Sequence, residues 1–207
     1  MKGNVMTIHR RLLLALPAAL ALAGQAAAQS QPPTRLRGTI LSGGDGTLAV
    51  KTQAGETVPL AVTDKTRILQ ILPARMEDIK PGSFIGTAAM PQKDGTLMAM
   101  EIQVFPEAMR GVGEGHRPWD LRPDSTMTNG TVGDVTGTSG RKLTLKYKGG
   151  EQTVTVPAEA PIITYAPGTP AMLTPGAHVI IFAVKDAGGA MRAGMIGVGK
   201  DGLVPPM

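Results

Sequence analysis

Hydrophobic and polar residues alternate over short stretches along most of the chain. Leucine and tyrosine alternate with lysine and threonine over 142–148, and this period of two predicts a half-buried β-strand. The segments 48–52 and 57–62 are rich in β-forming residues and flank residues 53–56, which are typical of a hairpin loop. The pattern therefore predicts short strands joined by tight turns.

The two halves of the chain share a register. An offset of 94 residues places Pro81–Gly82 on Pro175–Gly176, and an offset of 92 places Gly38–Ile40 on Gly130–Val132. A register kept over many positions is the sequence signature of an internal repeat. We therefore predict a duplication, with a length change of two residues in an early turn.

Each repeat is expected to fold into five or six short strands with one helical turn, which residues 73–80 supply in the first repeat. This order favours an all-β fold of two tandem, OB-like β-barrels, and a single merged β-sandwich is the alternative. The predicted domains are a first barrel over 29–105, a Gly/Pro-rich connector over 106–128, and a second barrel with a C-terminal tail over 129–207.

The first 28 residues have the pattern of a secretory signal peptide. Basic residues at 2, 10 and 11 precede an apolar stretch over 12–24, and three alanines end at Ala28. Thirteen apolar residues are too few for a membrane-spanning helix, which needs about 20. We expect cleavage near Ala28 and a periplasmic chain, and no later segment is long and apolar enough to act as a transmembrane anchor.

Composition removes several classes of function. The chain has no cysteine, which excludes disulfides, thiolate metal sites and cysteine nucleophiles. The signal segment holds three of the 21 basic residues and none of the 16 acidic ones, so the mature charge is +2. Aromatic residues make up 3% of the chain. Low charge and few stacking side chains argue against nucleic acid as a partner.

The connector over 106–128 carries the chain's only tryptophan and a concentration of charged residues. Long irregular loops are usually functional or disordered, and a lone tryptophan favours an ordered loop that packs against the barrels. Guanidinium groups in this segment would suit an anion. The residues predicted to contact a ligand or partner are Arg110, His116, Arg117, Trp119, Asp120 and Arg122.

A metal site is the alternative interpretation of the connector. Glu114, His116 and Asp120 have ligand chemistry that suits copper or zinc. Met98, Met100, Met191 and Met195 carry thioethers, which are soft ligands for Cu(I), although methionine more often fills gaps in a core. The main prediction includes no cofactor, and copper or zinc enters only with this alternative.

No sequence motif places a base next to a nucleophile, because the chain has no G-x-S-x-G, H-E-x-x-H or P-loop pattern. The sequence favours a non-enzymatic binding or interaction module whose partner is an unidentified protein or envelope component. A metal-transport accessory protein is the first alternative, and a hydrolase of an envelope polymer is the second. The sequence does not predict the oligomeric state.

The segments VFPEAMRGVGEGHRPWDL, STMTNGTV and LTLKYKGGE, with the ending KDGLVPP, carry a resemblance that extends over nearly the whole mature chain. In these segments the chain resembles an uncharacterised family of exported proteobacterial proteins with small β-barrel repeats. Some members of that family carry the automatic label "metal ABC transporter permease". A permease needs several spanning helices, which conflicts with this sequence. The resemblance implies the barrel repeats and export, and it assigns no functional residues.

Overall fold

The computed structural model describes residues 33–137, 141–186 and 188–206. The predicted signal peptide, residues 1–28, lies outside the described residues. In the described part of the chain, every helix is too short to cross a membrane. The described residues form an all-β fold with a few short 3-10 helices, as the alternating pattern predicted.

The element order is the same in the two halves of the chain. The first half contains β1 (Thr34–Gly44), β2 (Thr47–Thr52), β3 (Thr57–Ala61), β4 (Arg67–Pro73), η1 (Met76–Asp78), β5 (Phe84–Pro91) and β6 (Leu97–Val104). The connector contains η2 (Glu107–Met109) and β7 (Gly115–Pro118). The second half contains β8 (Thr126–Thr136), β9 (Lys142–Tyr147), β10 (Gly150–Thr155), β11 (Ile162–Pro167), η4 (Pro170–Met172), β12 (His178–Lys185), β13 (Met191–Gly199) and η5 (Lys200–Gly202).

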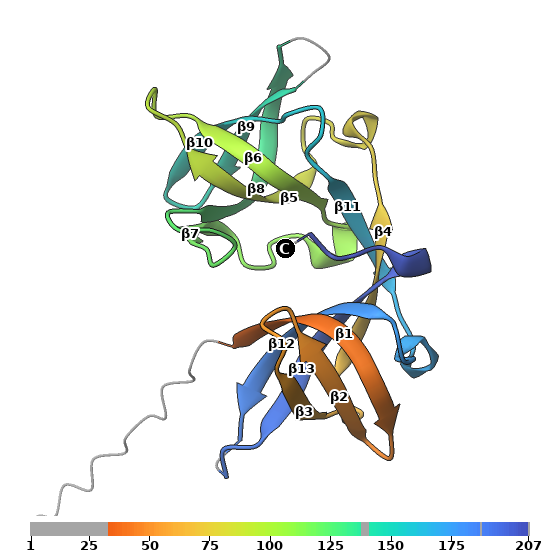
Figure 1. Ribbon diagram of the computed structural model, residues 1–207. Coiled ribbons are helices and arrows are strands. Elements are labelled where there is room, and N and C mark those ends of the chain that lie inside the picture. Colours follow the sequence, from red (N-terminus) through yellow and green to blue (C-terminus); the bar gives the residue numbers. More distant parts are fainter. Residues whose placement is uncertain (1–32, 138–140, 187, 207) are drawn as a thin grey trace, which may run out of the picture. The chain divides into compact units, whose positions relative to one another are not determined.

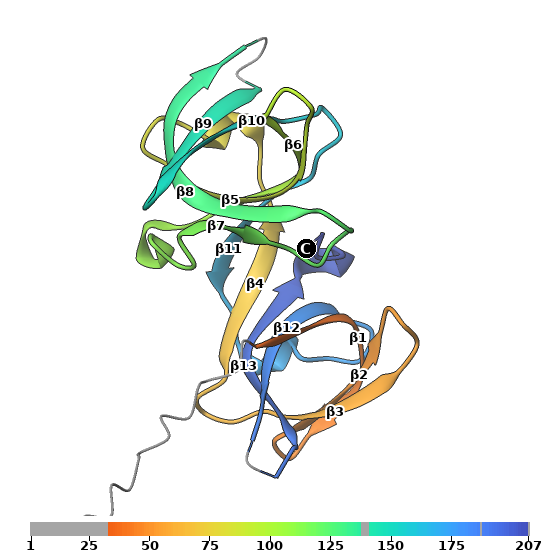
Figure 2. The same ribbon diagram turned by 90° about the vertical axis from the view of Figure 1, so that its left-hand side faces the viewer.

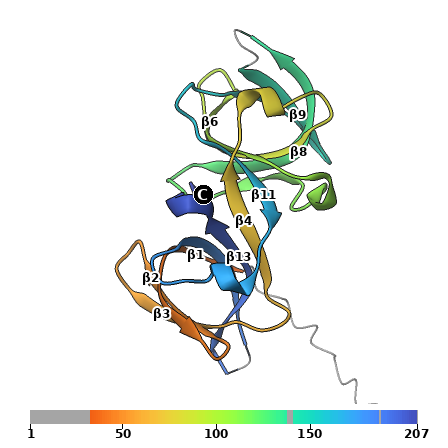
Figure 3. The same ribbon diagram turned by 90° about the vertical axis from the view of Figure 1, so that its right-hand side faces the viewer.

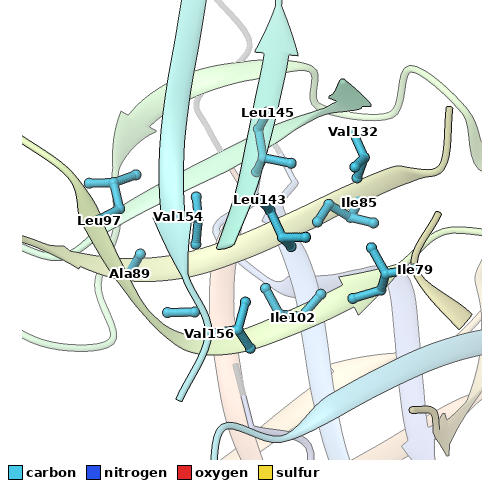
Figure 4. Close-up of a cluster of buried hydrophobic side chains, with 11 residues drawn as sticks. Ile79, Ile85, Ala89, Leu97, Ile102, Val132, Leu143, Leu145, Val154 and Val156 are labelled. Atoms are coloured by element: carbon cyan, nitrogen blue, oxygen red, sulfur yellow. The ribbon is translucent and has the colours of Figure 1, made fainter. Parts of the chain in front are cut away.

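Strands β5, β6, β8, β9 and β10 close a five-stranded barrel. Antiparallel pairs join β6 to β5, β5 to β8, β8 to β9 and β9 to β10, and a parallel pair joins β10 back to β6. Figure 4 shows the aliphatic side chains that fill this barrel. Most of them come from β5 and β6 in the first half and from β8 to β10 in the second half, and Ile79 and Val156 lie just outside these strands. A closed five-stranded barrel is confirmed, but its strands come from both halves of the chain and not from one repeat as predicted.

Strands β1, β2, β3, β12 and β13 pair in the same order. Antiparallel pairs join β13 to β12, β12 to β1, β1 to β2 and β2 to β3, and the ring closes through a parallel pair between Ala61 and Arg192. Its core is again aliphatic and includes Ile40, Leu48 and Ile196. Figure 2 shows both sets of strands.

The two rings exchange hairpins. One ring takes β1 to β3 from the first half and the β12–β13 hairpin from the second half. The other ring takes β8 to β10 from the second half and the β5–β6 hairpin from the first half. Neither predicted range, 29–105 or 129–207, therefore contains all the strands of one ring. Strands β4 and β11 pair with each other and also pair with β13 and β6, respectively, so they run between the exchanged hairpins (Figures 1 and 3).

Irregular positions also recur in the two halves. A β-bulge shifts the register of β1 after Ile40 and that of β8 after Val132. A second bulge shifts β6 beside Ala88 and β13 beside Phe182. Recurrent elements and bulges are what a duplication would leave, and the duplication itself stays a prediction.

Two local predictions need correction. The predicted helical turn over 73–80 is shorter, because Pro73 ends strand β4 and η1 covers only Met76–Asp78. The connector was expected to lack regular structure, but it contains η2 and strand β7. Strand β7 forms because it pairs with the neighbouring strand β8 as a hairpin across the loop 119–125.

Candidate functional site

The connector is held against strand β8 by backbone hydrogen bonds. Strand β7 pairs with Thr126–Asn129, and the backbone N–H of Trp119 donates to the carbonyl of Ser125 at 2.8 Å. The Ser125 hydroxyl donates to the carbonyl of Arg122 at 2.7 Å and closes the turn between them. The connector side chains therefore have defined positions.

Trp119 lies against two guanidinium groups. The guanidinium carbon of Arg35, on β1, is 4.0 Å from the ring centroid, and that of Arg117, on β7, is 5.6 Å away. Cations over an indole face are attracted by the ring's quadrupole. The indole N–H is buried and has no acceptor among the described residues. Two cations thus lie over the indole ring of Trp119 and contribute to its position in the connector.

Asp120 joins the connector to strand β1. Its carboxylate accepts hydrogen bonds from Arg35 Nε at 2.9 Å and from Arg37 Nη2 at 2.8 Å. Partial burial acts to raise the pKa of Asp120, but the hydrogen bonds and charges of Arg37 and Arg35 outweigh it, and the pKa lies below its usual value. Asp120 is therefore ionised at neutral pH and positions both arginines.

A cavity of about 310 Å³ opens beside Trp119. Strands β6, β7, β8, β11, β12 and β13 contribute to it together with the connector. Most of its walls are aromatic or methionine side chains, and the polar groups are few. The lining residues are Gln103, Phe105, Met109, Val112, Gly113, Arg117, Trp119, Met127, Asn129, Tyr165, Phe182 and Met195.

A chain of buried hydrogen bonds runs from the cavity wall to Glu101. The Tyr165 hydroxyl donates to Gln103 Oε1 at 2.7 Å, and Gln103 Nε2 donates to Glu101 Oε1 at 2.8 Å. Glu101 is 0% exposed. Burial raises its pKa to about 7, while the hydrogen bond from Gln103 and the charge of Arg37 act to lower it.

The bulge in β6 explains why Glu101 and Gln103 lie outside the barrel core. Leu97 and Ala99 belong to that core, and so does Ile102 after the register shift. An extra residue reverses the alternation of a strand, so Glu101 and Gln103 leave the barrel on the same side. The other carboxylate oxygen of Glu101, Oε2, has no hydrogen-bond partner among the described residues.

The structure brings together some of the predicted contact residues and separates others. Arg117 and Trp119 line the cavity, and Asp120 is adjacent to Trp119. Arg110 instead pairs with Glu107 at 2.6 Å. The remaining predicted contact residues, His116 and Arg122, are exposed and do not line the cavity.

The three predicted metal ligands each have a different partner. Glu114 accepts a hydrogen bond from the backbone N–H of Lys148 at 3.0 Å, and Asp120 is bound to the two arginines of β1. His116 Nδ1 lies 2.8 Å from the Thr128 hydroxyl, and burial and the charge of Arg117 lower the pKa of His116. In the described segments, no three His, Asp or Glu side chains are grouped so that they could hold a metal ion.

Sequence reasoning missed Arg35, Arg37, Glu101 and Gln103. A signal existed for the last two, because Glu101 and Gln103 are the polar residues in the otherwise apolar stretch 97–105. A buried polar residue is the informative exception in such a strand. The arginines of β1 had no comparable signal, since alternating polar residues on a strand usually face solvent.

A comparison with protein-family models, curated proteins and solved structures finds no match to this chain. The candidate site is therefore argued from its own geometry. Its defining features are a cavity with aromatic and methionine walls, a tryptophan held by two guanidiniums, and a buried carboxyl group behind the wall.

Proposed function

We propose that this chain is a non-enzymatic binding module that takes a small, mainly apolar ligand into the cavity beside Trp119. One observation carries the proposal. The chain has three phenylalanines, two tyrosines and one tryptophan, and four of these six side chains line this one cavity.

The distribution of aromatic residues supports a binding role. The cores of both rings are filled by aliphatic side chains, whereas Phe105, Tyr165 and Phe182 pack in a third cluster that forms one side of the cavity. Ligand pockets are typically concave, lined by apolar and aromatic groups, and fitted with a few polar groups. Three methionines in the wall add side chains that adapt to the shape of a ligand.

The polar groups of the wall favour binding over catalysis. They belong to Gln103, Arg117, Trp119, Asn129 and Tyr165, and none of these is an ordinary general base at neutral pH. Burial raises the pKa of the Tyr165 hydroxyl, and the nearby Glu101 raises it further. Tyr165 is therefore a hydrogen-bonding group here rather than a nucleophile.

Export to the periplasm is part of the same proposal and rests on the pattern of residues 1–28. The mass of the protein purified from the producing cells tests it. We expect a chain that begins near Gln29, and a chain that retains its first 28 residues would contradict export with cleavage.

The binding proposal is tested by NMR with toluene, p-cresol and phenylacetate as probes. The chain has one tryptophan, so a single indole N–H signal reports on the cavity. We expect at least one probe to shift this signal in a saturable way. If none of the three probes shifts it at millimolar concentration, the proposed function is wrong.

A matched pair of variants localises the binding. Val112 lines the cavity and is 44% exposed, whereas Leu41 is 46% exposed and is not a lining residue. Val112→Phe adds bulk at the cavity with little cost in stability and should weaken probe binding several-fold. Leu41→Phe makes a similar change elsewhere and should leave binding unchanged, and equal effects of both variants would place the binding outside the cavity.

A further inference from the structure

We propose that the ligand of this cavity is a small carboxylate with an apolar body of about ten non-hydrogen atoms, and that Arg117 binds its anionic group. The inference rests on the proposed function, since it names the class of ligand for the same site. It is carried by the charge balance around Trp119 and by the size and chemistry of the cavity.

Arg117 is a half-buried cation that lacks an acidic partner. Arg35, the other guanidinium over the indole, shares the carboxylate of Asp120 with Arg37. Arg117 Nη1 donates to the carbonyl of Gly113 at 2.7 Å, but Arg117 makes no ion pair with any described carboxylate. A guanidinium presents five donors, so most of its donors are left for a ligand.

The surroundings of Arg117 disfavour its positive charge in the absence of an anion. Burial lowers the pKa of Arg117, and the positive charge of Arg35 lowers it further. A carboxylate at this position would reverse both effects, because it neutralises the guanidinium and can pair with it through two hydrogen bonds. The cavity therefore carries an unpaired positive charge that a bound anion would neutralise.

Trp119 contributes apolar surface rather than a donor to the same ligand. It lines the cavity with Arg117, and its indole N–H is buried from the cavity as well as from solvent. The anionic group of the ligand is therefore bound by Arg117.

The volume of the cavity sets the size of the ligand. The cavity holds about 310 Å³, and a water molecule occupies about 30 Å³ of liquid, so roughly ten non-hydrogen atoms fit. The aromatic side chains of Phe105, Tyr165 and Phe182 form part of its wall. Such a wall suits an aromatic or branched aliphatic body.

A cationic ligand fits this cavity poorly. An amine would approach the unpaired charge of Arg117, and Arg35 lies on the same indole. The buried carboxyl of Glu101 interacts electrostatically with Arg37 and is not part of the wall. Electrostatics therefore separates an anion from an amine of the same shape.

The test compares three probes of nearly equal size: phenylacetate, its neutral isostere phenylacetamide, and phenethylamine. Each is titrated at pH 7 against the mature chain, with the Trp119 indole N–H signal as the readout. We expect phenylacetate to bind at least about tenfold more tightly than phenylacetamide, and phenethylamine to bind most weakly.

Arg117→Gln and Arg122→Gln are the matched variants. We expect Arg117→Gln to lower the affinity for phenylacetate to about that for phenylacetamide, which should itself be unchanged. Arg122 is an exposed arginine of the same connector outside the cavity wall, and Arg122→Gln should change nothing. Arg117→Lys retains the charge without the planar fork and should keep part of the preference for phenylacetate over phenylacetamide. This variant also tests the role of the charge if Arg117→Gln does not fold.

The outcomes separate this inference from the proposed function. If phenylacetamide binds as tightly as phenylacetate, or if phenethylamine binds best, the carboxylate inference is overturned and the binding cavity stands. The same holds if only toluene or p-cresol binds. If no probe of either series binds, the proposed function itself fails.

Discussion

At the scale of single residues, Glu101 is the most unusual group in the molecule. It is a fully buried carboxyl group whose pKa is raised to about 7 from an ordinary value of 4.5, chiefly by burial. The folded chain therefore holds this proton more tightly than the unfolded chain. Between pH 4.5 and 7 the folded state binds more protons, so the stability that Glu101 contributes falls as pH rises through this range.

Glu101→Gln should remove this pH dependence. The amide oxygen can still accept from Gln103, and the side chain no longer ionises. We expect the free energy of unfolding of the variant relative to the wild type to increase by up to about 3 kcal/mol between pH 4.5 and 8. Urea unfolding at both pH values measures it. Glu56→Gln changes an exposed glutamate and is the control, and parallel curves for the wild type and Glu101→Gln would contradict the burial argument.

Trp119 has a structural role beside its proposed binding role. Trp119→Ala removes a half-buried ring from between two guanidiniums and leaves Arg35 and Arg117 close together. We expect a loss of about 2 kcal/mol, which corresponds to a fall in Tm of roughly 4–8 °C for a chain of this length. Thermal unfolding followed by circular dichroism checks the value. An unchanged Tm would show that the connector does not contribute to stability.

At the scale of elements, two glycines allow the first strand of each half to lie close to its neighbour. A Cβ at Gly38 in β1 would lie 2.1 Å from the backbone oxygen of Lys51, and one at Gly130 in β8 would lie 2.6 Å from that of Lys146. Neither position has a positive φ, so close approach rather than backbone conformation requires glycine. The sequence aligned these two glycines at an offset of 92, and the structure supplies the reason.

Gly38→Ala should therefore be strongly destabilising. The obstructing atom is backbone, which cannot move without breaking the β1–β2 ladder, and we expect a loss of about 3 kcal/mol or more. Chemical denaturation measures this loss. Gly188→Ala is the matched control, because its Cβ would meet only the Asp186 side chain at 3.4 Å. A loss below about 1 kcal/mol at Gly38 would show that the strands can separate there.

At the scale of the whole molecule, the hairpin exchange makes the two halves interdependent. Each core contains side chains from both halves of the chain. A half without its partner would leave three strands unclosed and a hairpin with an exposed apolar face. Isolated hairpins are at best marginally stable in water. Folding of either ring thus requires the other half of the chain.

Fragments 33–123 and 124–206 test this interdependence, with the cut between two exposed turn residues, Pro123 and Asp124. We expect each fragment alone to lack cooperative unfolding, and the mixture to recover the circular dichroism spectrum and the cooperative transition of the uncut chain. A fragment that folds cooperatively alone would show that its five strands can close a barrel without exchange.

Local signals explain what sequence analysis predicted correctly. Strand positions follow from the period of two, as in β9, and hairpin turns follow from their glycines. These features depend on residues close together in the chain. The sequence also predicted that the connector is ordered, because a lone tryptophan favours a loop that packs against its surroundings.

The sequence by itself determined that the chain is all-β, where its strands lie, and which glycines must match between the halves. Only the tertiary structure decided which hairpin closes which ring. The β5–β6 and β12–β13 hairpins have similar strand patterns, so local sequence does not distinguish between them. The paths of β4 and β11 determine which ring each hairpin joins. The cavity follows from that choice, because Gln103 and Tyr165 meet Trp119 there only after distant strands pair.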